Sequence, residues 1–317
     1  MLKKVISLVT CTALAACLVS CDTDSGDTDS DKISVVTTIF PQYDFVRQIA
    51  GENVQLTMLL KPGSESHTYE PTPQDIVKIN ECDLFIYNGG EGDVWVDSIL
   101  ESADNSVNTL AMMDCVETVE EKIVEGMEAE EEEEESEEPE LDEHVWTSPE
   151  NAVKIVECIS DRLCEVDAEN AGKYQENTKK YVEELNNLDS RFKEIVSESN
   201  TKTMVFGDRF PFRYFADAYK INYYAAFPGC SSESEPSAST IAFLIDKVND
   251  EKIPAVFTIE FSNKKIAETI SESTGAEILE FHSCHNITSE DMKNGETYIS
   301  IMYRNADNLQ KAFQLTK

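Results

Sequence analysis

The stretch ENAGKYQENTKKYVEELNNLDSRFKEIVSES (residues 169–199) decides the fold. Its apolar residues recur at intervals of three and four, as on one face of an α-helix: Tyr181, Leu185, Leu188, Phe192 and Ile195. This spacing predicts an amphipathic helix of about 30 residues, long enough to run from one lobe of a protein to another. The alternative is a pair of independent domains tethered by a helical hairpin.

Short apolar runs rich in β-branched residues lie on both sides of this helix. They predict strands at residues 33–40, 54–60, 83–87, 203–206, 255–259 and 276–281. Helical patterns separate them, for example at residues 43–50, 239–249 and 264–273. Strands that alternate with helices indicate a parallel sheet. We therefore predict an α/β protein of two parallel-sheet lobes, with an N-terminal lobe at 33–168, one long linking helix at 169–199 and a C-terminal lobe at 200–317.

The charge of the chain is strongly negative. Among 317 residues, 26 are Lys or Arg and 62 are Asp or Glu, which gives a net charge of −36. Such a surface repels phosphate backbones and anionic membranes, so nucleic acid is excluded as a partner, whereas cationic ligands are favoured. The hydrophobic content of 41% indicates a globular chain.

The N-terminal sequence predicts a secretion signal followed by a site of lipid attachment. Lys3 and Lys4 precede a mostly apolar stretch at residues 5–19, which is too short for a comfortable membrane span. The stretch resembles a bacterial lipoprotein signal that ends at residue 20, which makes Cys21 the lipidated residue and residues 21–32 a polar linker. Cys17 also fits the pattern. A plain cleaved signal and an uncleaved anchor are the alternatives. Outside the cytosol, the six later cysteines allow fifteen pairings.

Four histidines are the candidates for chemistry: His67, His144, His282 and His285. All four fall in predicted loops, and the last two directly follow a predicted strand. Ligands of open α/β sheets collect beyond the carboxyl ends of strands, and imidazole is a favoured ligand of zinc. A single histidine is usually an ordinary polar side chain, and the His-x-x-His pair at the end of the chain is a weak signal by itself.

A set of motifs in conserved order resembles the metal-binding lipoproteins of zinc and manganese ABC importers. The motifs are found at residues 62–73, 82–89, 144–146, 214–216, 235–237, 274–276 and 295–298. The resemblance covers essentially the whole chain after the linker. It implies two α/β lobes, one long helix between them, and a metal ion in the cleft between the lobes.

The same resemblance implies the metal ligands. The first and second ligands of the family fall on His67 and His144, and the fourth falls on His282. At the third position, counted three residues ahead of Phe210, the chain has Gly207. We expect His285 to replace the missing ligand, with Asp208 and Glu260 as competing candidates.

The function that follows is capture of Zn²⁺ outside the cytoplasm and delivery to an ABC permease, by a monomeric, lipid-anchored protein that is not an enzyme. Four imidazoles favour Zn²⁺, whereas a site richer in carboxylates suits Mn²⁺, so a manganese-binding counterpart is the alternative. Zinc affinity is expected to fall below a pH of about 6.5. A zinc hydrolase is a further alternative, but the sequence does not contain the His-Glu-x-x-His motif expected of such an enzyme. A surface adhesin is the remaining alternative.

An acidic segment at residues 117–143 interrupts the first lobe. It holds 16 acidic residues and one lysine, with six consecutive glutamates at 130–135. The segment predicts either a solvated, self-repelling loop or a loose collector of cations. Carboxylates hold Zn²⁺ only weakly, so the segment does not define the site.

Overall fold

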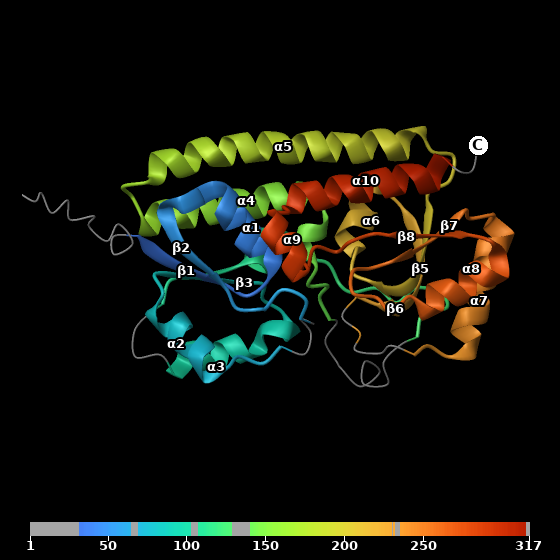
Figure 1. The fold of residues 1–317 in the computed structure, drawn as a ribbon, viewed down its shortest axis with the longest axis horizontal. Helices are drawn as coiled ribbons and strands as arrows, with labels where there is room; N and C mark the ends of the chain where they lie inside the picture. The colour runs from blue at the N-terminus through green and yellow to red at the C-terminus, as the bar shows by residue number, and fades with distance from the viewer. Residues whose placement is uncertain are drawn as a thin grey trace, which may run out of the picture. The chain divides into compact units, whose positions relative to one another are not determined.

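The computed structural model describes residues 32–64, 69–102, 107–128, 140–229, 231 and 235–314 (Figure 1). The predicted signal, Cys17, Cys21 and His67 therefore lie outside the described residues. The structure forms one compact unit from Ile33 onwards. Within the described ranges, no helix has the length and hydrophobicity needed to cross a membrane.

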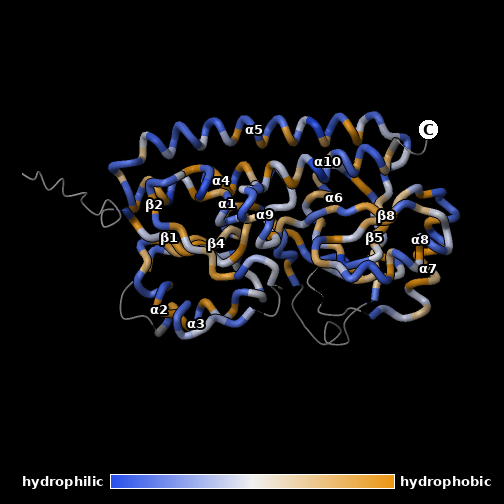
Figure 2. The backbone as a smooth tube through the Cα atoms, viewed as in Figure 1, coloured by the Kyte–Doolittle hydropathy of each residue, from blue (hydrophilic) through white to orange (hydrophobic). Residues whose placement is uncertain are grey.

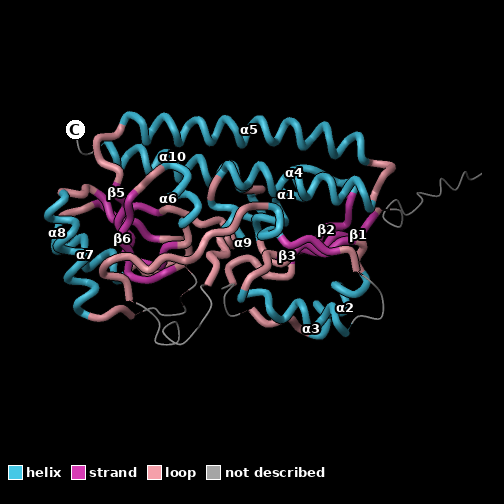
Figure 3. Tube along the Cα trace, turned by 180° about the vertical axis from the view of Figure 1, so that it is seen from behind, coloured by secondary structure: helices cyan, strands magenta, loops and turns pink. Residues whose placement is uncertain are grey.

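The N-terminal lobe is built on a parallel four-stranded sheet. Its strands, in spatial order, are β2 (Val54–Met58), β1 (Ile33–Thr37), β3 (Leu84–Tyr87) and β4 (Thr109–Ala111). The helices of this lobe are α1 (Phe40–Ala50), α2 (Pro73–Glu81), α3 (Val94–Ser102) and α4 (Pro149–Val166). Figures 1 and 3 show α2 and α3 on one face of the sheet and α1 and α4 on the other.

Alternation along the strands explains why both faces are covered. On β1, Val35 packs into the cluster beneath α1 and α4, whereas Val36 packs into the cluster beneath α2 and α3. On β3, Leu84 takes the first side and Phe85 the second. Successive side chains of a strand point to opposite faces of the sheet. When consecutive residues of a strand are apolar, both faces of the sheet must therefore be covered by helices.

The C-terminal lobe repeats this plan. Its parallel strands, in spatial order, are β6 (Asn222–Pro228), β5 (Thr203–Phe210), β7 (Ala255–Thr258) and β8 (Glu277–Glu280). Its helices are α6 (Arg213–Tyr219), α7 (Ala238–Glu251), α8 (Lys265–Thr274), α9 (Ser289–Asn294) and α10 (Tyr298–Gln314). Val205 faces the side covered by α7 and α8, and Phe206 faces the opposite cluster. The predicted class of two parallel-sheet α/β lobes is confirmed.

Two helices connect the lobes. The long helix α5 (Ala171–Glu198) packs against α1 and α4 of the first lobe and against α10 (Figure 1). Figure 2 shows hydrophobic and hydrophilic residues alternating along α5, as the sequence pattern predicted. Helix α10 starts against the first lobe, where the backbone nitrogen of Tyr298 donates to Asp44 Oδ2 at 2.6 Å. The lobes therefore share one hydrophobic cluster, to which both sheets contribute.

Two described residues of the acidic segment (residues 117–143), Glu121 and Glu128, are bound to the second lobe. The backbone nitrogen of Glu128 donates to the carbonyl oxygen of Ala226 on β6 at 3.0 Å. The Glu121 carboxylate accepts a hydrogen bond from the backbone nitrogen of Gly229 at 2.8 Å. A loop that is solvated along its whole length, as one of the two predicted alternatives has it, would not make these contacts. The run of six glutamates lies outside the described residues.

Candidate metal site

His144 is a buried histidine held by a neighbouring carboxylate. It precedes the short 3-10 helix η4 (Val145–Thr147), and it is 0% exposed. Asp142 Oδ1 accepts a hydrogen bond from the backbone nitrogen of His144 at 2.9 Å and lies 3.2 Å from its Nδ1. A proton on Nδ1 is stabilised by this carboxylate, which leaves the lone pair of the neutral imidazole on Nε2, available for a metal.

The surroundings of His144 also raise its pKa. Burial opposes a positive charge on the ring, but the hydrogen bond to Asp142 and the charges of Asp142 and Glu143 outweigh burial, so the pKa of His144 lies above 6.5. The environment therefore favours a cation at this position, whether a proton or a metal ion.

His285 faces His144 from the other lobe. It lies in the loop that follows β8, and its ring centroid is 5.5 Å from that of His144, with the ring planes at 89°. The ring also packs 4.9 Å from the indole ring of Trp146. The His285 carbonyl oxygen accepts a hydrogen bond from the backbone nitrogen of Phe40 at 3.3 Å. Two imidazoles from the two lobes are thus brought together.

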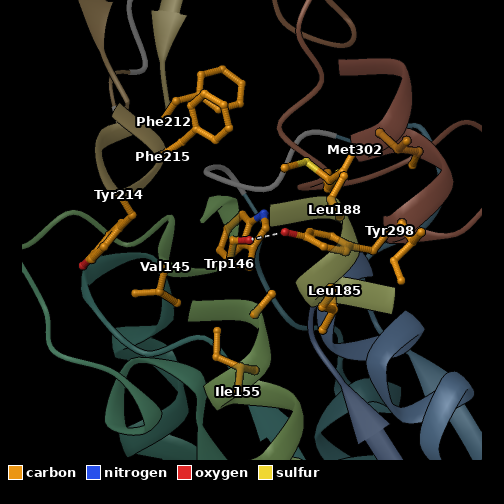
Figure 4. Packing of buried hydrophobic residues seen from close by; sticks show 14 of the residues in the cluster. Val145, Trp146, Ile155, Leu185, Leu188, Phe212, Tyr214, Phe215, Tyr298 and Met302 are labelled. Carbon is orange, nitrogen blue, oxygen red and sulfur yellow. Dashed lines mark hydrogen bonds between the residues drawn. The ribbon is translucent and has the colours of Figure 1, made fainter. Parts of the chain in front are cut away.

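The loop that carries His285 is fixed by buried polar contacts. Trp146 Nε1 donates to the carbonyl oxygen of Ser283 at 2.7 Å. The Tyr298 hydroxyl donates to the carbonyl oxygen of Trp146 at 2.7 Å, and Figure 4 shows these two side chains meeting in the core. Glu260 accepts from the backbone nitrogen of Ser283 at 2.7 Å and also from its hydroxyl.

A cavity opens beside the two histidines. Ser64 and His144 line it from the first lobe, and Arg209, Glu260 and His285 are among its lining residues from the second. Both carboxylate oxygens of Glu260 already accept hydrogen bonds from Ser283. Glu260 therefore lines the cavity and also holds the loop that carries His285, and each of its oxygens keeps a further lone pair.

The structure explains why residue 207 carries no ligand. A Cβ atom on Gly207 would lie 2.6 Å from the backbone nitrogen of Ala267 on α8, so no side chain fits there. The residue of β5 that lines the cavity is Arg209. The third ligand position of the family lies three residues ahead of a phenylalanine. If that phenylalanine is Phe212, the position falls on Arg209. Arg209 is not evident from the sequence when the spacing is taken from Phe210, which leads to Gly207.

Two other predicted candidates are not among the residues that line the cavity. His282 is 7% exposed, and its Nδ1 accepts a hydrogen bond from the backbone nitrogen of Cys284 at 2.9 Å. A neutral imidazole that accepts at Nδ1 carries its proton on Nε2, which leaves no lone pair there for a metal. Asp208 Oδ1 accepts from the backbone nitrogen of Arg209 at 2.9 Å, and burial raises the pKa of Asp208.

His67 is outside the described residues, but its chain neighbours border the site. Ser64 lines the cavity between the lobes, and Tyr69 lines a second cavity, which His285 also lines. Over the described ranges, no three His, Cys, Asp or Glu side chains are grouped closely enough to hold a metal ion.

The second cavity is lined by two acids, of which Glu143 is buried and Asp93 is half-buried. Asp93 and Glu143 border it together with His285. Burial raises the pKa of Asp93 to about 6 and that of Glu143 to about 7. Asn88 Nδ2 donates to the carbonyl oxygen of Glu143 at 3.0 Å, which fixes the residue next to His144.

Asp142 and Asn286 are two polar residues at the site that the sequence analysis missed. Asp142 could have been found from its place two residues before His144, because metal-binding histidines commonly donate to a carboxylate. Asn286 follows His285 directly, but an asparagine in a loop carries no signal of its partners. Its contacts depend on a segment more than 200 residues away.

A family model described as zinc-uptake complex component A, periplasmic, matches residues 35–312. The chain belongs to this family. The resemblance seen in the sequence motifs is thereby confirmed.

Members of the zinc-uptake component A family match the chain along nearly all of its length. The zinc-binding lipoprotein AdcA of Streptococcus pneumoniae is 32% identical over 97% of the chain, which spans only 61% of that protein. The high-affinity zinc uptake system protein ZnuA of Bacillus subtilis is 33% identical over 94% of the chain and 92% of that protein. The Zn(II)-bound ZnuA-like domain of pneumococcal AdcA is 30% identical, with a TM-score of 0.74 over 89% of the chain and 99% of the domain.

Proposed function

We propose that the chain binds Zn²⁺ as cargo between its two lobes and delivers it to an ABC permease. The observation that carries the proposal is the pair of imidazoles, His144 and His285, which lie 5.5 Å apart at a cavity bordered by both lobes. Family membership supports it, because related proteins are named for zinc binding and zinc uptake.

The proposed ligands are His144 and His285, with His67 as the third. Imidazoles match the preference of Zn²⁺ for nitrogen, whereas Mn²⁺ prefers a site richer in oxygen. Among the described residues that line the cavity, Glu260 supplies the one carboxylate, beside the imidazoles of His144 and His285. The donor set therefore favours zinc, and the manganese-binding counterpart remains the competing proposal. His282 keeps a role in holding its loop.

The chain's own residues prepare the site before the ion arrives. Asp142 stabilises a proton on His144 Nδ1, which leaves the lone pair of the neutral ring on Nε2, and Trp146 packs against His285. The protons of protonated ligands must leave when the metal binds, so affinity is expected to fall as pH falls. No nucleophile or general base is assigned, and the proposed activity is transport without catalysis.

The proposed location is the outer face of a bacterial cell membrane. A diacylglycerol on Cys21 would anchor the chain, and the linker of residues 21–32 would separate the lobes from the lipid. We propose that the protein acts as a monomer, with the permease as its partner. An adhesin with the same anchor would not depend on the histidines.

Competitive titration with Zn²⁺ and Mn²⁺ tests the proposal on protein that begins at residue 22. Wild type is expected to bind one Zn²⁺ tightly and Mn²⁺ far more weakly. His144→Ala and His285→Ala should each lower zinc affinity at least tenfold, whereas the exposed control Glu251→Gln should not. Zinc binding unchanged in both histidine variants would contradict the site, and a preference for Mn²⁺ would favour the manganese alternative.

A further inference from the structure

Two described stretches of the acidic segment run antiparallel to each other. The backbone nitrogen of Asp142 donates to the carbonyl oxygen of Val119 at 3.0 Å. An antiparallel bridge pairs the adjacent residues Glu120 and Leu141. His144 follows two residues after Asp142, so its place depends on how this pair of stretches is held.

A hydroxyl group of the second lobe holds both stretches. Tyr214 lies on α6, and its hydroxyl donates to the carbonyl oxygen of Asp142 at 2.8 Å. The same hydroxyl oxygen accepts from the backbone nitrogen of Val119 at 3.2 Å. The residue is 5% exposed, and in Figure 4 its side chain points away from that of Phe215. Tyr214 therefore uses its hydroxyl as both donor and acceptor on the chain that leads to His144.

Asp142 connects this hydroxyl to the ring of His144. Asp142 is 1% exposed, and its Oδ1 accepts from the backbone nitrogen of His144 at 2.9 Å and lies 3.2 Å from its Nδ1. Because the carbonyl oxygen and the carboxylate belong to one residue, a shift of the Asp142 backbone moves the group that holds the imidazole. Without the hydroxyl of Tyr214, the buried carbonyl of Asp142 would lose this hydrogen bond, which favours such a shift.

The second lobe meets the chain around His144 at two further places. Helix α6 packs against η4, the short helix that directly follows His144. A Cβ atom on Gly229, which follows β6, would lie 3.1 Å from Cε1 of His144, so these two residues are in close contact. A proposed ligand carried by the first lobe is thus positioned by residues of the second.

We propose that Tyr214 is a positioning residue of the zinc site, which holds His144 through the backbone of Asp142. This inference rests on the proposed function, and it adds a residue of the opposite lobe that is not among the lining residues of the cavity. Loss of the hydroxyl lowers zinc affinity by weakening the contribution of His144. His285 is carried by another loop, which is held through Ser283, so its contribution stays intact.

A double-mutant cycle on zinc affinity distinguishes positioning from a general loss of stability. The variants are Tyr214→Phe, His144→Ala and their combination, beside Tyr214→Phe combined with His285→Ala. Tyr214→Phe is expected to weaken zinc binding about fivefold or more. In His144→Ala the same change should have no further effect, whereas in His285→Ala it should cost its full factor.

The matched control is Tyr219→Phe. Tyr219 also lies on α6 and is also 5% exposed, but its hydroxyl donates to Asp189 Oδ1 on α5 at 2.9 Å. This variant should lose stability and keep wild-type zinc affinity. If Tyr214→Phe lowers the melting temperature of the metal-free protein too far for titration, all variants are titrated in sucrose, which favours the folded state.

The outcomes separate the inference from the proposed function. If wild type fails to bind zinc, or if His144→Ala binds zinc as wild type does, the proposed function fails. If both behave as proposed, wild-type zinc affinity in Tyr214→Phe overturns the inference. An equal loss of affinity in Tyr219→Phe also overturns it, as does a loss from Tyr214→Phe that is undiminished in His144→Ala.

Discussion

Trp146 Nε1 donates to the carbonyl oxygen of Ser283 at 2.7 Å, and this bond joins the two lobes. Trp146 lies two residues after His144, and Ser283 lies two residues before His285. The indole and the carbonyl are both buried. The bond therefore fixes the separation of the two backbones that carry the proposed ligands.

Trp146→Phe removes this donor and keeps an aromatic ring in the core. The buried carbonyl of Ser283 then loses its partner, which is expected to lower the free energy of unfolding by about 1–3 kcal/mol. Zinc affinity should fall several-fold because the backbone of His285 is less constrained. Denaturant unfolding and competitive zinc titration measure the two effects.

Trp95→Phe is the matched control for this change. Trp95 packs against Tyr69 and Phe85, but over the described residues its Nε1 has no hydrogen-bond partner. The Trp95→Phe variant should therefore keep wild-type zinc affinity. Equal zinc affinity in the two tryptophan variants would show that the bond to Ser283 does not position the site.

Asp142→Asn tests the carboxylate that orients His144. The amide attracts the Nδ1 proton less strongly than the carboxylate does, so the tautomer with its proton on Nδ1 is less favoured. Zinc affinity is expected to fall by about 10–100-fold, the usual cost of losing such a partner. Asp114→Asn, at an exposed position of the same lobe, is the control. Wild-type zinc affinity in Asp142→Asn would show that Asp142 does not orient His144 for zinc binding.

Asp93 predicts a specific pH dependence of stability. Burial raises its pKa to about 6 from 3.8, so the folded protein holds a proton that the unfolded chain has released. A raised pKa means that the stabilisation is complete below the unfolded value and is lost as pH rises through about 6. Wild type should therefore lose stability at this site between pH 5 and pH 7.5.

Asp93→Asn removes that proton equilibrium. Its Oδ1 can still accept from the backbone nitrogens of Asn88 and Gly89, which both donate to Asp93 Oδ2 in the wild type. Relative to wild type, the variant should gain about 1 kcal/mol between pH 5 and pH 7.5. The measurement is denaturant unfolding of metal-free protein at both pH values. A difference that is independent of pH would show that Asp93 has an ordinary pKa.

Gly207→Ala tests the close packing of β5 on α8. The added Cβ would lie 2.6 Å from the backbone nitrogen of Ala267, so the helix must shift. Overpacking of this kind is expected to cost about 1–3 kcal/mol of unfolding free energy. At Gly172, nothing lies within 4 Å of an added Cβ, so Gly172→Ala should leave stability unchanged or slightly higher. Equal stability of the two variants would contradict the packing argument.

Much of the fold was predictable because its signals are local. The strand run around Val35 and Val36 and the apolar face of α5 are each visible within one short stretch. The boundary after β1 was less accurate, because the predicted strand reached residue 40 whereas α1 begins at Phe40. Gln42 Oε1 accepts from the backbone nitrogens of Thr38 and Ile39 and ends the strand early, and this contact is not evident in the pattern.

The candidate site was less predictable because its contacts join distant parts of the chain. The sequence singled out the histidines, but not that His285 would face His144 while His282 accepts a hydrogen bond at Nδ1. The choice between the two depends on how the loop after β8 turns, which Glu260 and Trp146 determine through Ser283. None of these partners is near in sequence.

The most direct test of a zinc ion held between the lobes is X-ray absorption at the zinc edge, on zinc-loaded protein. Wild type is expected to show scattering from three imidazoles. His285→Ala is expected to lose the scattering of one imidazole, and His282→Ala is expected to show no change. An unchanged spectrum in His285→Ala, or the loss of an imidazole in His282→Ala, would contradict the proposed site.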